Sequence, residues 1–200
     1  MWRRGSPDFD RVLEECVSNV LRQTDELRRS AAEFSDYARL PGPRMHAVDV
    51  GGLLRETAAA FAGARRIRWR VEAEPGSVAE ADERLLSRAL SNLVGNAVEA
   101  LGSSGGEIAL TSVLAGDRLR VTVEDDGPGV SPEVQARLFE PYFSARSGGT
   151  GLGLAIVKKI VEEHGGTISA ENRPEGGFRV TLDLPLSRSL EDAAARSAPA

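Results

Sequence analysis

Cysteine is almost absent from this 200-residue sequence, and histidine occurs only twice. The single Cys16 excludes a disulfide framework within the chain and a cysteine-rich zinc site, as expected of a protein from a reducing, cytosolic compartment. The sequence also lacks a signal peptide and any apolar run close to the roughly 20 residues that cross a bilayer. We therefore expect contact with a membrane only through segments outside this chain.

Positive charge is also in short supply. The chain has 25 Lys and Arg against 30 Asp and Glu, which gives a net charge of -5 and a pI near 5.2. Such a chain lacks the electrostatic footprint of a nucleic-acid-binding protein, so we expect no nucleic-acid partner. Its 41% hydrophobic and 28% charged residues are typical of a soluble globular protein, and its length allows one sizeable domain with an extension.

Glycine and proline are missing from residues 8–40, which predicts one long helix that ends at the Leu-Pro-Gly-Pro sequence of residues 40–43. Within it, a heptad seam interrupted only by a threonine is formed by Leu13, Val17, Val20, Thr24, Leu27, Ala31, Phe34 and Ala38. One interpretation is an amphipathic helix that packs on its own domain. A seam this long and narrow favours a partner helix from another subunit or from missing sequence.

The remaining sequence alternates between helical and extended patterns. We expect a domain over residues 47–186, followed by a disordered Ala-, Ser- and Arg-rich tail over residues 187–200. Helices are predicted at 82–101 and 152–164, a short helix after an N-cap at Ser131, and a hairpin of two final strands. Adjacent strand pairs mixed with helices predict a two-layer α/β (α+β) sandwich with one sheet face covered.

Three patches in this domain suit ligand binding. In the first, Asn92, Asn96 and Glu99 stand at i, i+4 and i+7 on one face of a predicted helix, roughly opposite its leucines. Asparagine is a mediocre helix former, so two on one face require a reason. This face is either simply solvated or supplies oxygen ligands to a hard cation such as Mg²⁺.

The second patch is the acidic turn Asp125-Asp126-Gly127-Pro128-Gly129, which follows an apolar strand. It is either an ordinary surface turn or a site at the lip of the core. In such a site a carboxylate can accept a hydrogen bond from an exocyclic amine, and glycines let a flat ring approach the backbone.

The third patch is the glycine-rich sequence of residues 148–153, directly before a helix. Glycines let the N–H groups of the loop fold around phosphate oxygens, and the helix N-terminus attracts anions. The spacing matches neither the dinucleotide fingerprint nor the P-loop, because the third glycine and the Gly-Lys-Ser/Thr sequence are missing.

In this order, the patches resemble the nucleotide-binding boxes of sensor histidine kinases, within the gyrase, heat-shock-chaperone and mismatch-repair ATPase superfamily. "NLVGNAVEA" resembles the N box, "DDGPG" the DxGxG box, "LFEPYFSA" the F box and "GTGLGLAIV" the GxGLG box. The resemblance covers residues 48–185 and implies a Bergerat-type ATP-binding sandwich. Residues 20–43 resemble the second helix of the dimerisation and phosphotransfer hairpin in nitrogen-regulation-type sensor kinases.

The resemblance implies ATP and Mg²⁺ as cofactors and a role for each matching residue. Asn96 would hold Mg²⁺ on the ATP phosphates, and Asn92 would support that ion or the phosphates. Asp125 would accept a hydrogen bond from the adenine amine, with Gly127 and Gly129 shaping the ring slot.

A lid between the F and GxGLG boxes is also implied. Phe139 and Phe143 would brace it, and Arg146 would replace a lysine that related sequences often carry. Thr181 would reach adenine through water. The implied ATP site is completed by Glu99, Val130, Gly149, Thr150, Gly151, Leu152, Gly153 and Leu154.

Asn92 also bears on the reaction. ATP-hydrolysing relatives carry a glutamate at this position to activate water, whereas an amide cannot act as a general base. This implies transfer of the γ-phosphate to a histidine on an upstream helix, and from there to the receiver domain of a response regulator. Neither His46 nor His164 has the setting of that acceptor, so we expect ATP binding without self-phosphorylation. A longer protein would form a homodimer through the N-terminal helix.

Two other functions stay open. A non-catalytic ATP-sensing interaction module would use the same pocket, and its nucleotide would change lid order and partner binding. An anti-sigma-type serine kinase has a similar ATP site, although the heptad helix argues against it. Phosphorylation of a separate hairpin that carries the histidine would distinguish the kinase from the module.

Overall fold

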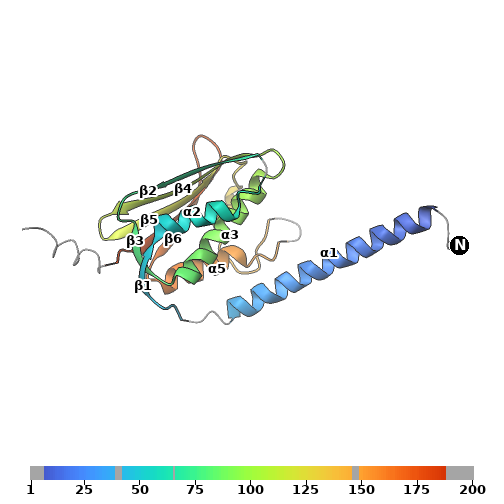
Figure 1. Cartoon of the computed structure of the whole chain (residues 1–200), viewed down its shortest axis with the longest axis horizontal. Helices are drawn as coiled ribbons and strands as arrows, with labels where there is room; N and C mark the ends of the chain where they lie inside the picture. The colour runs from blue at the N-terminus through green and yellow to red at the C-terminus, as the bar shows by residue number, and fades with distance from the viewer. Residues whose placement is uncertain (1–6, 39–41, 65, 146–148, 188–200) are drawn as a thin grey trace, which may run out of the picture.

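The computed structural model describes residues 7–38, 42–64, 66–145 and 149–187. Its first element, α1 (Pro7–Ala38), is one uninterrupted helix that extends away from the rest of the fold (Figure 1). Five seam residues are 49–72% exposed: Leu13, Val17, Val20, Leu27 and Phe34. The seam therefore does not pack on its own domain, and the first of the two interpretations is wrong.

The following residues form the predicted two-layer sandwich. Its main sheet has the strand order β2-β4-β5-β7-β6. The bounds are β2 (Ile67–Ala73), β4 (Gly106–Ala115), β5 (Arg118–Asp125), β6 (Thr167–Asn172) and β7 (Phe178–Pro185). β2 runs parallel to β4, and the other neighbours are antiparallel. The last two strands are the predicted hairpin.

Three helices cover one face of this sheet (Figure 1). α2 (Val50–Ala60) lies over β2 and β4, α3 (Glu83–Leu101) over β4 and β5, and α5 (Gly153–Glu163) over β6. The core between the two layers is fully buried, and its large side chains include Leu54, Leu90, Leu110, Ile156 and Leu182. Burial of each such side chain stabilises the fold by about 1.5–3 kcal/mol.

The other face of the sheet carries charged side chains. Arg120 binds Asp183 at 2.8 Å, and Arg179 binds Glu124 at 2.6 Å and Glu171 at 3.1 Å. Side chains alternate between the two faces of a strand, so these residues lie opposite the apolar ones that meet the helices. The sequence prediction that helices cover only one face is confirmed.

One short strand was missed by the sequence analysis. β3 (Val78–Ala81) pairs antiparallel with β1 (His46–Asp49) in a separate two-stranded sheet. Four residues are too few for an alternating pattern to be recognised. β3 leads directly into Asp82, whose carboxylate caps α3 by accepting a hydrogen bond from the Leu85 N–H at 3.0 Å.

The domain extends one residue beyond its predicted end. Ser187, which the sequence analysis placed in the disordered tail, is buried. Its N–H donates to the Val78 carbonyl at 3.2 Å, and its hydroxyl bonds Glu80 at 3.0 Å. Residues 188–200 of the predicted tail lie outside the described residues. Among the described helices, none is both long and apolar enough to span a bilayer.

Candidate functional site

A cavity of about 770 Å³ lies between α3, the turn after β5 and the segment before α5. All three patches line it, although they are far apart in the sequence. The residues of the predicted site on its wall are Asn92, Asn96, Glu99, Asp125, Gly129, Val130, Phe143, Gly149, Thr150, Gly151, Gly153 and Leu154. The structure therefore brings most of the predicted site residues into one cleft.

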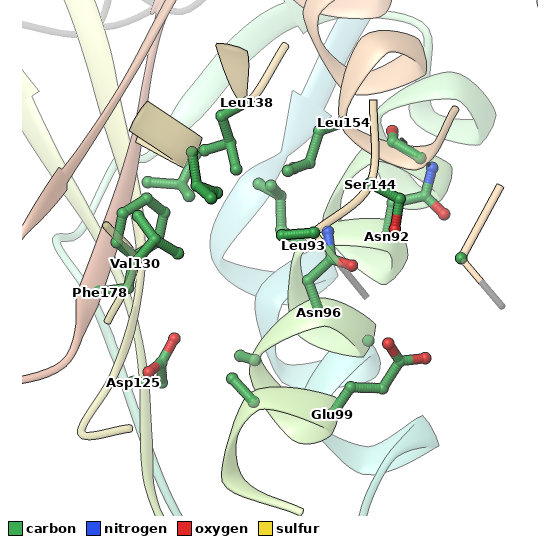
Figure 2. A pocket seen from close by; sticks show the side chains of 18 of the residues that line it. Asn92, Leu93, Asn96, Glu99, Asp125, Val130, Leu138, Ser144, Leu154 and Phe178 are labelled. Carbon is green, nitrogen blue, oxygen red and sulfur yellow. Dashed lines mark hydrogen bonds between the residues drawn. The ribbon is translucent and has the colours of Figure 1, made fainter. Parts of the chain in front are cut away.

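The helical spacing of the first patch positions its polar side chains. Figure 2 shows Asn92, Asn96 and Glu99 along the side of α3 that faces the cavity. Asp125 and Phe178 lie across the cavity from them. The same helix buries its leucines against the sheet, so its orientation is held by the core.

Asp125 is a buried carboxylate on the opposite wall. The residue is only 6% exposed, and the Gly127 N–H donates to its Oδ1 at 2.9 Å. Burial raises the pKa of the Asp125 carboxyl, while hydrogen bonds from the backbone of Gly127 and Phe178 act in the opposite direction. A buried acceptor with free hydrogen-bonding capacity beside a cavity is suited to a ligand's amine donor.

The two glycines of this turn have different tasks. Gly129 lines the cavity with φ +69°, a left-handed conformation that side-chain-bearing residues rarely adopt. Gly127 is not part of the cavity wall, and instead its N–H orients Asp125. A Cβ on Gly127 would lie 2.8 Å from the Asp125 Oδ1, so a side chain there would displace the carboxylate.

The glycine-rich segment packs closely against the F box. Gly151 has φ +68°, and its carbonyl accepts a hydrogen bond from the Tyr142 N–H at 3.0 Å. A Cβ on Gly151 would lie 2.5 Å from the Tyr142 backbone. Leu152 is buried beneath the segment and does not line the cavity.

α5 begins at Gly153 on the cavity wall. Its N-cap residue, Leu152, makes no side-chain hydrogen bond to the first turn, so the first N–H groups of the helix lack a side-chain cap. Such a terminus favours anions. The side-chain amide of Asn92 donates to the Gly153 carbonyl at 3.3 Å and joins α3 to this end of α5.

The F-box segment closes another side of the cavity. α4 (Pro132–Arg137) begins after the predicted N-cap Ser131, which accepts a hydrogen bond from the Val134 N–H at 3.4 Å. Phe143 lines the cavity, and the Arg137 guanidinium lies 4.2 Å from its ring centroid. Phe139 is half-buried and is not part of the wall. Arg146 lies outside the described residues.

One predicted site residue lies on the wrong face of the sheet. Thr181 pairs with Thr122 of β5, on the same charged face as Arg179 and Asp183. Its neighbour Val180 and Phe178 face the cavity instead. Because strand side chains alternate, Thr181 points away from the cavity, contrary to the sequence prediction that it belongs to the site.

The wall also contains apolar residues that were not predicted from the sequence. The additional lining residues include Leu93, Val123, Pro128, Leu138, Phe178 and Val180. Most belong to ordinary core patterns, so no signal separates them from residues that only pack. Only Phe178 had a usable signal. It lies three residues before Thr181 on the same strand, so the two side chains must face opposite sides of the sheet.

The two histidines lie away from the cavity. His46 is exposed, with its Nε2 3.8 Å from Glu83. His164 is 2% exposed, and its Nδ1 bonds the Ile160 carbonyl at 2.6 Å while its Nε2 accepts from the Asp82 N–H at 2.9 Å. This pattern requires a neutral imidazole with the proton on Nδ1. His164 is therefore a buried link between α5 and the start of α3.

Comparisons with known proteins agree with this geometry. The family "Histidine kinase-, DNA gyrase B-, and HSP90-like ATPase" matches residues 81–188, more than half of the chain. The nitrogen regulation protein NtrY of Azorhizobium caulinodans is 37% identical over an alignment of 181 residues that covers 86% of this chain and 24% of NtrY. The chain thus spans about a quarter of that relative's length.

Solved structures share the arrangement of the elements. Histidine kinase ThkA in complex with the response regulator protein TrrA matches with a TM-score of 0.73 and 26% identity, over 94% of this chain and 54% of ThkA. Full-length ShkA in complex with AMPPNP matches with a TM-score of 0.72 and 29% identity, over 86% of this chain and 39% of ShkA.

The sandwich and its cleft define an ATP-binding domain of the Bergerat type. The chain belongs to the histidine kinase-, DNA gyrase B- and HSP90-like ATPase family. Within that family, its relatives include sensor histidine kinases of two-component signalling systems.

Proposed function

We propose that this chain is the ATP-binding catalytic portion of a cytosolic two-component sensor histidine kinase. The observation that carries the proposal is the shared cleft of the paired amides, the buried Asp125 and the glycine-rich start of α5. These three groups line different sides of the cleft and together fit one nucleoside triphosphate. The amides suit a hard cation, Asp125 suits the amine of a base, and the start of α5 suits the phosphates.

The nucleobase belongs beside the acidic turn. Asp125 accepts a hydrogen bond from the exocyclic amine of adenine, and Gly129 lets the ring approach the backbone. Val123 and Phe178 provide apolar surface at the same end of the cavity. The raised pKa of Asp125 comes first from its burial, and a bound amine donor would give this half-enclosed carboxylate a hydrogen-bond partner on the cavity side.

The triphosphate belongs at the other end. The N–H groups of the glycine-rich segment and of the first turn of α5 donate to its oxygens, and the helix dipole favours its charge. Asn92, which is bonded to Gly153, keeps α3 at a fixed distance from these donors. Thr150 and Ser144 add hydroxyl groups to the same wall.

The donor set also fits Mg²⁺, which binds oxygen and usually shares its sites with substrate phosphates. Asn96 lines the cavity with its side-chain amide, and Asn92 and Glu99 lie one turn away on either side. When bound, the ion neutralises charge on the phosphates. The role of α3 is to place these oxygens on a rigid helix packed on the core.

The chemistry proposed is transfer rather than hydrolysis. A histidine nitrogen on an upstream helix attacks the γ-phosphorus, the bond to the β,γ-bridging oxygen breaks, and ADP leaves with that oxygen. Asn92 stands where a general base for water would be needed, and an amide cannot take the proton. The cleft supplies positioning and charge stabilisation instead.

Two partners are proposed, a second copy of the longer protein and a receiver domain. The exposed apolar seam of α1 suits a homodimer through the helical hairpin of the longer protein. The match to ThkA, solved in complex with the response regulator TrrA, supports a receiver domain as the next phosphate acceptor. Any membrane contact would come from other segments.

The test uses the chain and a separate hairpin that carries the acceptor histidine. We expect Mg-ATP to bind the chain, radiolabelled γ-phosphate to appear on the hairpin, and none on the chain alone. ATP binding without hairpin labelling would instead favour an ATP-sensing module. Labelling of a serine on an anti-sigma-factor antagonist would favour the serine kinase. Absence of ATP binding would contradict all three.

A further inference from the structure

The end of the β6–β7 hairpin is fastened to the acidic turn that forms one wall of the cleft. Asn172 is the last residue of β6. Its Oδ1 accepts a hydrogen bond from the Val130 N–H at 2.9 Å, and its Nδ2 donates to the Val130 carbonyl at 2.8 Å. One side-chain amide therefore satisfies both backbone groups of a residue that lines the cavity, as a neighbouring strand would.

The strand register explains how Asn172 reaches the turn. Phe178 is directly opposite Asp125 of β5 on one side and directly opposite Asn172 of β6 on the other. Directly opposite residues of antiparallel strands lie on the same face of the sheet. A row on the cavity face of the sheet is therefore formed by Asp125, Phe178 and Asn172. The turn that follows Asp125 passes over this row and reaches Asn172 at Val130.

The contact between hairpin and turn is close at both ends. Gly129 has φ +69°, and a Cβ there would lie 2.5 Å from the Asn172 Oδ1. At the other end, the Arg173 guanidinium donates to the Asp125 carbonyl at 3.1 Å. A side chain on Gly177 would overlap the same Asp125 carbonyl. The hairpin thus holds the turn at its first residue and at Val130.

We propose that Asn172 is a positioning residue for nucleobase recognition. By fixing Val130, it sets the shape of the slot between the acidic turn and α3, and so the position of the base relative to the Asp125 carboxylate. A turn with two glycines has many accessible conformations, and ordering it on binding would weaken affinity. This inference rests on the ATP site proposed above.

The experiment compares nucleobase selectivity in four variants by calorimetric titration with Mg-ATP and Mg-GTP. For Asn172→Ala we expect about five- to tenfold weaker ATP binding, from the loss of two partly exposed hydrogen bonds. GTP has no amine at the position that Asp125 reads, so its affinity falls less and the ATP/GTP preference decreases. Asn172→Asp keeps the acceptor for the Val130 N–H but loses the donor to the Val130 carbonyl. Its ATP affinity and its ATP/GTP preference should therefore lie between those of the wild type and of Asn172→Ala.

Glu171→Ala is the matched control. Glu171 is the neighbouring residue on β6 and pairs with Arg179 on the charged face of the sheet, so its removal disturbs the hairpin without touching the turn. We expect this variant to keep the wild-type preference. Thermal unfolding of each variant reports any general loss of stability.

Two results would overturn the inference. The first is an Asn172→Ala protein with wild-type ATP affinity, and the second is an equal loss of ATP and GTP affinity, which a purely structural role would produce. If Asn172→Ala does not fold, Asn172→Asp is judged by the same criterion. Asp125→Ala distinguishes the two proposals. Wild-type ATP affinity in Asp125→Ala would contradict the proposed base site itself. Weak ATP binding by Asp125→Ala together with wild-type affinity in Asn172→Ala would reject only the role of Asn172.

Discussion

The side-chain amide of Asn92 donates to the Gly153 carbonyl at 3.3 Å, and this bond joins the amide-bearing helix α3 to the start of α5. The two walls that would grip the triphosphate are thus connected through protein contacts alone, although 61 residues separate them in the chain. Holding the walls together in advance lowers the ordering cost of binding a nucleotide. Asn92 therefore has a structural task besides any contact with the phosphates or metal.

Replacing Asn92 by alanine should affect both stability and binding. Loss of the bond to Gly153 should lower the free energy of unfolding by about 0.5–1.5 kcal/mol, the usual range for one hydrogen bond. Mg-ATP affinity should fall further than this loss alone explains, because the phosphate wall also becomes less ordered. Denaturant unfolding and calorimetric titration measure the two effects, and wild-type ATP affinity in the variant would contradict the connection.

Asn96 should determine how strongly Mg²⁺ assists ATP binding. For the wild-type chain we expect tighter ATP binding with Mg²⁺ than with a chelator, and for Asn96→Ala a much smaller difference. Asn19→Ala is the control, because Asn19 is an exposed amide on α1 that contacts only Arg22 among the described interactions. An Asn96→Ala chain with an unchanged response to Mg²⁺ would place the metal elsewhere.

Asp125 should reduce stability at neutral pH in exchange for its role in binding. Its pKa in the folded chain is raised, first by burial, so the folded state binds the proton more tightly than the unfolded state does. Stability therefore falls as the pH rises from the ordinary Asp pKa of about 3.9 through the raised folded value. Asp125→Asn should be more stable than the wild type above that window, and the difference should vanish below it.

This pH dependence can be measured by urea unfolding of both proteins from pH 3 to pH 8. The same Asp125→Asn chain should bind Mg-ATP more weakly, because a charged acceptor is replaced by a neutral one. A variant that is less stable than the wild type at pH 7 would show that the hydrogen bond from Gly127 outweighs the cost of burial.

His164 should be important for folding rather than for phosphate transfer. His164→Ala leaves the Asp82 N–H and the Ile160 carbonyl without their side-chain partner and creates a cavity at a residue that is 2% exposed. We expect the free energy of unfolding to fall by about 2–4 kcal/mol. His46→Ala, at an exposed position, should change it by no more than about 0.5 kcal/mol. Equal stability of the two variants would contradict this assignment.

Much of the fold could be predicted because its signals are local and periodic. α3 combines an N-cap, an apolar stripe and a polar stripe, and each is visible in the sequence. The long helix α1 follows from the absence of glycine and proline over thirty residues. The convergence of the three patches was predicted only through the resemblance to a family, since no local pattern specifies that distant segments share a cleft.

The errors arose where tertiary contacts decide. β3 is too short to show a pattern, and Ser187 is buried by a strand more than a hundred residues earlier. Thr181 was expected in the site only through the resemblance to the family, but the register of β7 turns it to the charged face. Asn172 carried no signal at all, since its role depends on the position of Val130.

Gly151 should be required for both the shape of the glycine-rich segment and nucleotide affinity. It adopts φ +68°, and any Cβ would lie 2.5 Å from the backbone of Tyr142. Alanine there should lower the free energy of unfolding by about 1–3 kcal/mol through backbone strain and overlap. The segment can relieve the overlap only by moving away from Tyr142, which displaces its N–H groups, so ATP affinity should fall about tenfold or more. Gly63→Ala is the control, since a Cβ at Gly63 meets nothing within 4 Å and its φ is not left-handed. If Gly151→Ala matches Gly63→Ala in both stability and ATP titration, the conformation of the segment has no bearing on how the chain holds phosphate.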